Sequence, residues 1–221
     1  MNDDEILRRQ RIAIIEDFQL IHDSLAIIDA INREREGIDR NYDPFIDHLL
    51  ISSEHLIGIK LWNLIAKKES SQHNLHKFVT NISKSIDAYS KQIWPQIISD
   101  EERNRKNQSI IKNIKILSTT LEGLIKDPLY TKINNWRDQV FAHFDDSQII
   151  GRLYCDNGTI SSKSFVQIRE KWVSDNKLTF CQIGSVVDEL FLTANRIGIG
   201  SVVESRDTME TVVKIVLGKL R

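Results

Sequence analysis

Apolar residues recur every three or four positions along most of this chain, which is the spacing of amphipathic helices. The first such stripe predicts one long helix over residues 3–36, and Gly37 follows it as a helix-ending residue. Further stripes are separated by polar or glycine-containing links. Their expected ranges are 43–67, 75–94, 99–126, 128–144, 164–173, 178–197 and 203–220. The pattern therefore predicts an all-α bundle of about seven or eight helices.

Capping signals support three of these helix starts. Asp43-Pro44 and Asp127-Pro128 each place a capping carboxylate before a proline, which is tolerated in the first turn of a helix. Ser99 and Glu102 have the spacing of a capping box. We therefore expect helices to begin at these positions.

One segment departs from the helical pattern. Residues 149–160 are rich in β-formers and contain Asn157-Gly158, a frequent hairpin turn, so we expect one small β-hairpin there. The sequence contains no internal repeat and no low-complexity tract. The expected organisation is a single helical domain over 1–221, with the long N-terminal helix packed on the rest.

The overall charge is balanced, with 30 Lys and Arg against 31 Asp and Glu. Any affinity for nucleic acid must therefore come from local patches. The longest stretch without a charged residue is only ten residues, 178–187, whereas a membrane-spanning helix needs about twenty. The acidic start does not resemble a secretory or transit signal, so we expect a cytoplasmic protein without membrane association.

The helix expected over 128–144 carries the most informative group of polar residues. Arg137 and His143 stand six positions apart near its end, and about one such pair is expected by chance in a chain of this composition. Their surroundings make the pair more specific. Asp138 directly follows the arginine, Ala142 precedes the histidine, and Asp145 lies two residues beyond it.

This motif resembles that of the HEPN superfamily (higher eukaryotes and prokaryotes nucleotide-binding), in its abortive-infection type. The resemblance covers about ten residues, together with a helical layout over roughly 40–200. It implies a metal-independent endoribonuclease without cofactors, acting on single-stranded RNA as a toxin or antiviral defence effector, which an antitoxin protein can oppose. Some toxin members carry a tyrosine two residues after the histidine, whereas this chain has Asp145 there.

Helix geometry indicates how such a site is assembled. At about 100° per residue, Arg137 and His143 lie about 120° apart around a helix and ~9 Å apart along it, so they do not form a tight pair within one chain. This spacing suits a cleft or a two-fold interface, and in a homodimer the histidine of one protomer can meet the arginine of its partner. His143 is then the general acid and base, Arg137 holds the phosphate, and Asp138 orients either group.

A second feature is a run of basic residues without any acidic one, which predicts a helix face that contacts RNA phosphates. A solvated face paired with acids elsewhere is the alternative. The run consists of Arg103, Arg105, Lys106, Lys112 and Lys115.

Two further alternatives stay open. His143 can be a structural histidine at a helix end and Arg137 a surface ion-pair donor, which would make the chain a catalytically silent helical dimerisation or interaction module. Incomplete sets of metal-ligating residues also occur at helical spacing, and none of them forms a complete motif. They are Asp47, His48, Glu54 and His55 in one helix and His73 with His76 in the next.

Overall fold

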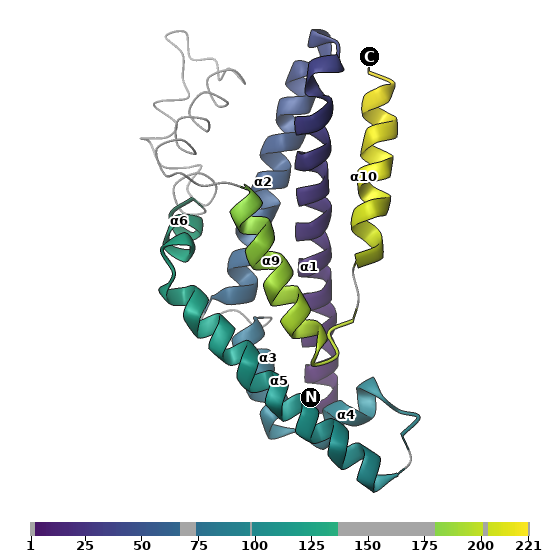
Figure 1. Cartoon of the computed structure of the whole chain (residues 1–221), viewed down its shortest axis with the longest axis vertical. Coiled ribbons are helices and arrows are strands. Elements are labelled where there is room, and N and C mark those ends of the chain that lie inside the picture. Colours follow the sequence, from purple (N-terminus) through teal and green to yellow (C-terminus); the bar gives the residue numbers. More distant parts are fainter. Residues whose placement is uncertain (1–2, 67–73, 98, 137–179, 201–202, 221) are drawn as a thin grey trace.

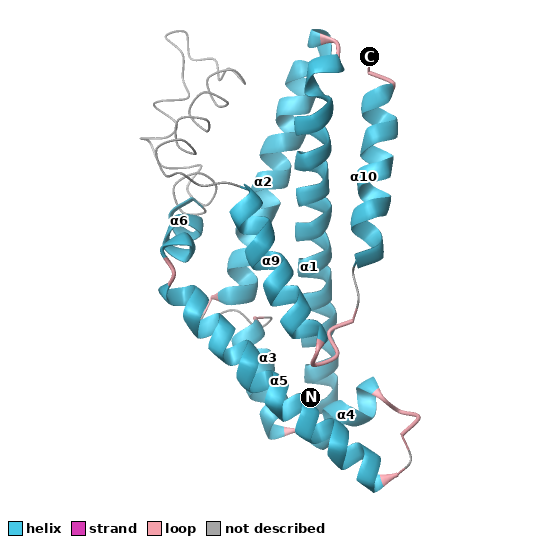
Figure 2. Ribbon diagram, viewed as in Figure 1, coloured by secondary structure: helices cyan, strands magenta, loops and turns pink. Residues whose placement is uncertain are grey.

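The computed structural model describes residues 3–66, 74–97, 99–136, 180–200 and 203–220, and all of their regular elements are helices (Figure 2). The all-α prediction is therefore confirmed for this part of the chain. The hairpin expected near 149–160 and the helix expected over 164–173 lie outside the described residues. The helices are α1 (Asp3–Glu34), α2 (Asp43–Ile65), α3 (Leu75–Lys84), α4 (Ile86–Ile93), α5 (Asp100–Lys126), α6 (Pro128–Trp136), α9 (Phe180–Asn195) and α10 (Val203–Gly218).

The long helix α1 organises the bundle. It lies between α2 and α10 and also contacts α3, α4 and α9 (Figure 1). Two short 3-10 turns, Arg35–Gly37 and Arg40–Tyr42, connect α1 to α2, which returns alongside it. The predicted apolar stripe of α1 is buried throughout, and burial of that stripe holds the helices together.

Local capping signals explain the observed starts of α5 and α6. The Asp127 carboxylate accepts a hydrogen bond from the Leu129 amide at 2.7 Å, directly before α6. The Ser99 hydroxyl accepts from the Glu102 amide at 3.4 Å and begins α5. These side chains satisfy amides that have no partner within the helix. Both predicted starts are confirmed.

The start of α2 differs from the prediction by one residue. The capping position is Tyr42, and Asp43 already belongs to the first turn of the helix. The reason is the preceding 3-10 turn, which runs directly into α2 and is itself capped by Asp39, whose carboxylate accepts from the Asn41 amide at 2.9 Å. The Asp43 carboxylate therefore complements the helix dipole instead of capping the helix.

The single helix predicted over 75–94 is wrong, because the chain breaks at Ser85 into α3 and α4. Ser85 has φ −134° and ψ 47°, outside the helical region. The break allows α4 to pack against α5 and α1. It also buries Tyr89 completely, with its hydroxyl donating to the Ile197 carbonyl at 2.7 Å. Tertiary packing, without a glycine or proline, produces this break.

Candidate nucleic-acid interface

The predicted catalytic residues Arg137, Asp138 and His143 lie outside the described residues, and the helix that leads to them, α6, is described up to Trp136. Helix α6 contacts both α2 and α5. Ile133 is fully buried, and the side chains of Leu129 and Tyr130 pack against the core. The described residues directly before Arg137 therefore belong to a capped helix that contacts both α2 and α5.

The basic run at the start of α5 divides into two groups, and the first group is structural. The Arg103 guanidinium donates to the Ile97 carbonyl, in the connection between α4 and α5. The ammonium group of Lys106 lies 5.1 Å from the centre of the Trp94 ring, a cation–π contact. Both side chains hold this connection against α5. Two of the five residues of the predicted run therefore have structural contacts within the chain, and contact of the run with RNA stays a prediction.

The second group, Arg105, Lys112 and Lys115, is exposed on the outer side of α5. Arg105 forms an ion pair with Glu101 at 3.7 Å, and both side chains are highly exposed, so water and salt weaken this pair. Lys112 and Lys115 are one helical turn apart and point to the same side. Together they form the part of the predicted run that remains free to contact a phosphate chain.

One basic residue of this outer face was missed by the sequence analysis. Lys126 is exposed in the last turn of α5 and follows Lys115 by eleven residues, which is close to three helical turns. Glu122 lies between Lys115 and Lys126, so Lys126 does not belong to the acid-free run. The helical spacing of exposed cations, instead of an uninterrupted run, is the signal that finds Lys126. We name Arg105, Lys112, Lys115 and Lys126 the α5 basic face.

The polar groups inside the bundle join helices and do not form a reaction centre in the described part of the chain. The Asp17 carboxylate on α1 lies 2.7 Å from the Lys60 ammonium on α2, in an ion pair that is mostly buried. His22 on α1 stands edge-on to the Phe191 ring of α9, with ring centres 5.3 Å apart. Its Nδ1 atom is 3.9 Å from the carboxylate of Asp188. These contacts fix the positions of α2 and α9 around α1.

The metal-ligand alternative gains no support from the described residues. Asp47 is engaged by the Arg35 guanidinium at 2.8 Å. Glu54 is completely buried, and burial lowers the pKa of His55 below its usual value. No three His, Cys, Asp or Glu side chains come together within the described ranges, and His73 lies outside them.

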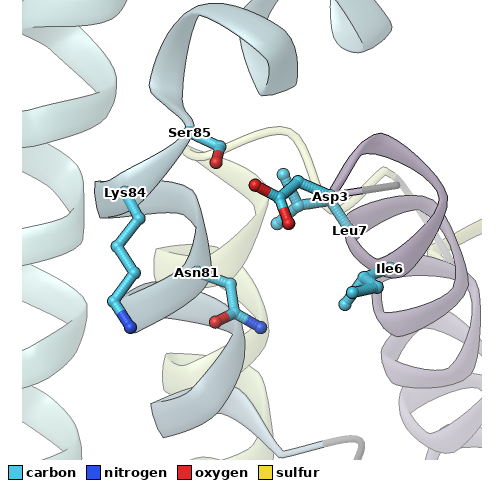
Figure 3. Close-up of a pocket in the computed structure, with 6 residues that line it drawn as sticks. All are labelled: Asp3, Ile6, Leu7, Asn81, Lys84 and Ser85. Carbon is cyan, nitrogen blue, oxygen red and sulfur yellow. The ribbon is translucent and has the colours of Figure 1, made fainter. Parts of the chain in front are cut away.

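A small pocket lies between the start of α1 and the α3–α4 junction. Figure 3 shows its lining residues, among them Asp3, Asn81 and Lys84. Its volume of about 80 Å³ is well below the roughly 300 Å³ at which small-molecule sites begin. The Asn81 amide is already bonded to Gln10 at 2.9 Å. This pocket is therefore a packing feature between helices.

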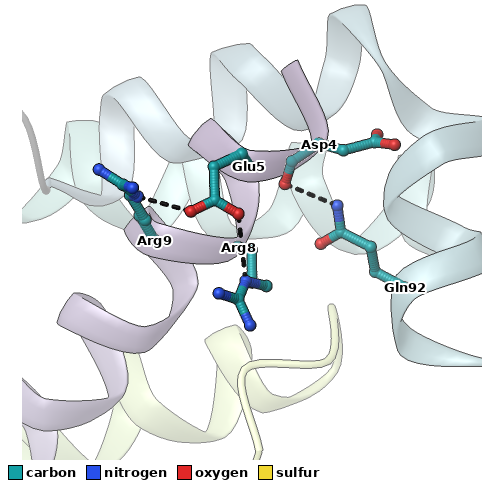
Figure 4. A network of polar contacts seen from close by, with 5 residues as sticks. All are labelled: Asp4, Glu5, Arg8, Arg9 and Gln92. Carbon is teal, nitrogen blue, oxygen red and sulfur yellow. Dashed lines mark hydrogen bonds and ion pairs between the residues drawn. The ribbon is translucent and has the colours of Figure 1, made fainter. Parts of the chain in front are cut away.

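The neighbouring contacts at the start of α1 also have a structural role. Glu5 accepts from Arg9 at 2.7 Å and from Arg8 at 3.3 Å, and the Gln92 amide donates to the Asp4 carbonyl at 2.8 Å (Figure 4). The two guanidinium groups lower the pKa of Glu5. The acidic side chains at this end complement the helix dipole, and Gln92 attaches the first turn of α1 to α4.

Comparisons with protein-family models, curated proteins and solved structures find no significant match to this chain. Within the described ranges, no helix combines the length and apolar content needed to cross a bilayer.

Proposed function

We propose that this chain is a metal-independent endoribonuclease of HEPN type that cleaves single-stranded RNA at a composite site in a homodimer. The observation that carries the proposal is the motif formed by Arg137, Asp138, Ala142, His143 and Asp145. Two features of the described part support it: the helical fold and the capped helix α6, which directly precedes the motif in the sequence. A role as a toxin or abortive-infection effector against phage, opposed by an antitoxin, follows from the same resemblance.

The chemistry needs only these side chains and the substrate. His143 accepts the proton of a ribose 2′-hydroxyl, and the 2′-oxygen attacks the adjacent phosphorus. The bond from phosphorus to the 5′-oxygen breaks, and that oxygen receives a proton from imidazolium. Arg137 holds the phosphate and stabilises its developing charge, while Asp138 orients a neighbouring group. The products are a 2′,3′-cyclic phosphate and a 5′-hydroxyl.

The α5 basic face is the proposed approach for the RNA backbone. Its lysines lie on the helix that leads through Asp127 into α6, and α6 directly precedes the motif in the sequence. The double variant Lys112→Glu/Lys115→Glu should weaken RNA binding and reduce its dependence on salt, because about two phosphate contacts are lost. Lys77→Glu/Lys84→Glu makes the same change of charge at two exposed lysines of α3, outside the α5 basic face, and serves as the matched control.

The decisive experiment is cleavage of a single-stranded RNA in excess EDTA, followed by mass spectrometry of the fragments. We expect 2′,3′-cyclic phosphate and 5′-hydroxyl ends, no cleavage of the matching DNA, and no activity in Arg137→Ala or His143→Ala. A DNA strand resists because it lacks the 2′-hydroxyl. Ends carrying a 5′-phosphate, or activity that disappears with EDTA and returns with Mg²⁺, would contradict the proposal. Melting temperatures of both variants close to wild type would separate lost chemistry from lost stability.

The composite site also predicts a dimer. Light scattering should give about twice the 25.6 kDa monomer mass, with or without RNA. Mixing inactive Arg137→Ala with inactive His143→Ala should restore activity, because a mixed dimer contains one intact pair. A monomer that cleaves RNA, or mixing without any rescue after subunit exchange, would rule out the shared site.

A catalytically silent interaction module is the second candidate, and one observation favours it. Helix α10 exposes an aliphatic stripe on its outer side, formed by Val212, Ile215 and Val216 at 43–57% exposure. Such a stripe is typical of a surface that contacts another protein. Figure 1 places α10 and α6 on opposite sides of the α1–α2 pair, so this stripe and α6 do not form one surface. An RNA assay without activity, with partner binding lost in Ile215→Asp, would favour this second function.

A further inference from the structure

A groove of about 270 Å³ separates the second half of α5 from α9 and ends at the junction between α5 and α6. Its deepest residues are apolar: Leu190 is completely buried, and Leu124 is nearly so. Val186 is partly buried and packs against the same core. The groove therefore has the volume for one or two side chains and an apolar floor to receive them.

The described charged residues that line the groove are all acidic. Asp127 and Glu189 lie at its exposed rim, and none of the described residues that line it is a lysine or arginine. Across the described ranges neither carboxylate has an ion-pair partner, although Asp127 caps the first turn of α6. Two carboxylates beside an apolar floor complement a ligand that carries aliphatic and cationic groups together.

Gly123 keeps the groove open on the α5 side. It stands inside a helix, where glycine costs stability relative to alanine, and no described atom lies within 4 Å of the position that a β-carbon would take. Close packing within the described fold therefore does not require a glycine here. A missing side chain at this position instead leaves room for a guest to approach the α5 backbone.

We propose that this groove is the docking site for a basic, aliphatic peptide segment of another protein. An aliphatic side chain of the segment fills the space over Leu124, Val186 and Leu190. Its lysine or arginine side chains pair with Asp127 and Glu189. An RNA strand is disfavoured as the occupant, because its phosphates would meet two carboxylates.

The groove ends at Asp127, which caps the helix leading to Arg137. A peptide seated here contacts the start of α6, the helix that directly precedes the motif in the sequence. The consequence for RNA cleavage rests on the proposed function, whereas peptide binding does not depend on it. The groove borders the α5 basic face, since Gly123 follows Lys112 by eleven residues and precedes Lys126 by three, although neither lysine is among the described residues that line it.

The test is a selection from a display library of random twelve-residue peptides on the full-length protein, followed by affinity measurements on the recovered peptides. We expect recovered sequences to combine at least two basic residues with an aliphatic one. Gly123→Leu, which fills the groove, should weaken their binding at least about tenfold, because a buried aliphatic side chain of the peptide loses its place. This variant should fold at least as well as wild type, since leucine favours helix over glycine.

Two further variants sharpen the result. Asp127→Asn with Glu189→Gln removes both charges, retains a capping side chain for α6, and should weaken binding about fivefold at low salt while reducing its salt dependence. Gly184→Leu makes the same change on α9 outside the groove lining and should leave affinity within about twofold. Recovery of no peptides, of peptides without basic residues, or of peptides that bind Gly123→Leu as well as wild type would overturn the proposal. Failure of wild-type protein to cleave RNA would contradict the nuclease proposal alone, because the peptide selection does not depend on cleavage.

Discussion

The connection from α9 to α10 offers a quantitative test of the fold. Gly198 and Gly200 both adopt positive φ values, 88° and 66°, which are unfavourable for residues with a β-carbon. Gly198 also has no space for a side chain, because a β-carbon there would lie 2.5 Å from Cδ1 of Ile93 and 3.1 Å from its Cγ2. At Gly200 the nearest atom, Cδ1 of Ile15, would be at an ordinary 3.6 Å. The two glycines thus share a backbone conformation and differ in available space.

Gly200→Ala should lower the free energy of unfolding by about 1–2 kcal/mol, the usual cost of a left-handed conformation for alanine. Gly198→Ala should lower the free energy of unfolding by about 1–3 kcal/mol more than Gly200→Ala does, because Ile93 must move out of its packed position. Gly198 is also held from the other side, since the Arg11 guanidinium donates to its carbonyl at 2.8 Å. The loop therefore has little freedom to shift and relieve the overlap.

Urea unfolding of the two variants measures these losses of stability. The comparison is valid when the dependence of the unfolding free energy on urea concentration is the same in both variants and in wild type. The double variant Gly198→Ala/Ile93→Ala should be more stable than the sum of its single changes predicts, by about 1–3 kcal/mol, since truncation of Ile93 removes the overlap. Equal losses at Gly198 and Gly200, or additive effects of Gly198→Ala and Ile93→Ala, would refute the steric argument and leave only the backbone term.

Two further predictions concern buried or partly buried titratable groups. Tyr89→Phe should lower the free energy of unfolding by about 1–2 kcal/mol, because the bond to Ile197 is lost, whereas Tyr42→Phe at an exposed site should have no effect. Burial raises the pKa of Tyr89, so the unfolded chain releases a proton above pH 10 that the folded chain keeps. Wild-type stability should therefore fall as pH rises above 10. A Tyr89→Phe variant that loses the same stability at alkaline pH would contradict this. Burial lowers the pKa of His55, so its contribution to stability should be lost as pH falls below 6.5, and urea midpoints at pH 7.5 and 5.5 should differ less in His55→Gln than in wild type. An equal difference in both proteins would show that other groups cause the acid loss.

Local signals in the sequence were sufficient for much of the described fold. The stripe on α1 predicted its burial, and Ser99 and Asp127 predicted the starts of α5 and α6. These features depend on residues within one or two helical turns of each other, so their physics is contained in short segments. The motif around Arg137 and His143 is likewise a local pattern. It specifies which chemical groups are available, and its function stays a prediction.

The tertiary structure decided what depends on contacts between distant segments. No residue near Ser85 signals a break, because the gain comes from packing α4 against α5 and from burying Tyr89 beside the chain near Ile197. Five basic residues form one run in the sequence, but in the fold Arg103 donates to the Ile97 carbonyl and Lys106 lies over the Trp94 ring. The α5–α9 groove has no counterpart in any single segment, since its two walls are separated by more than fifty residues. Helix formation is governed by neighbours in sequence, whereas the exposure and pairing of a side chain are governed by neighbours in space.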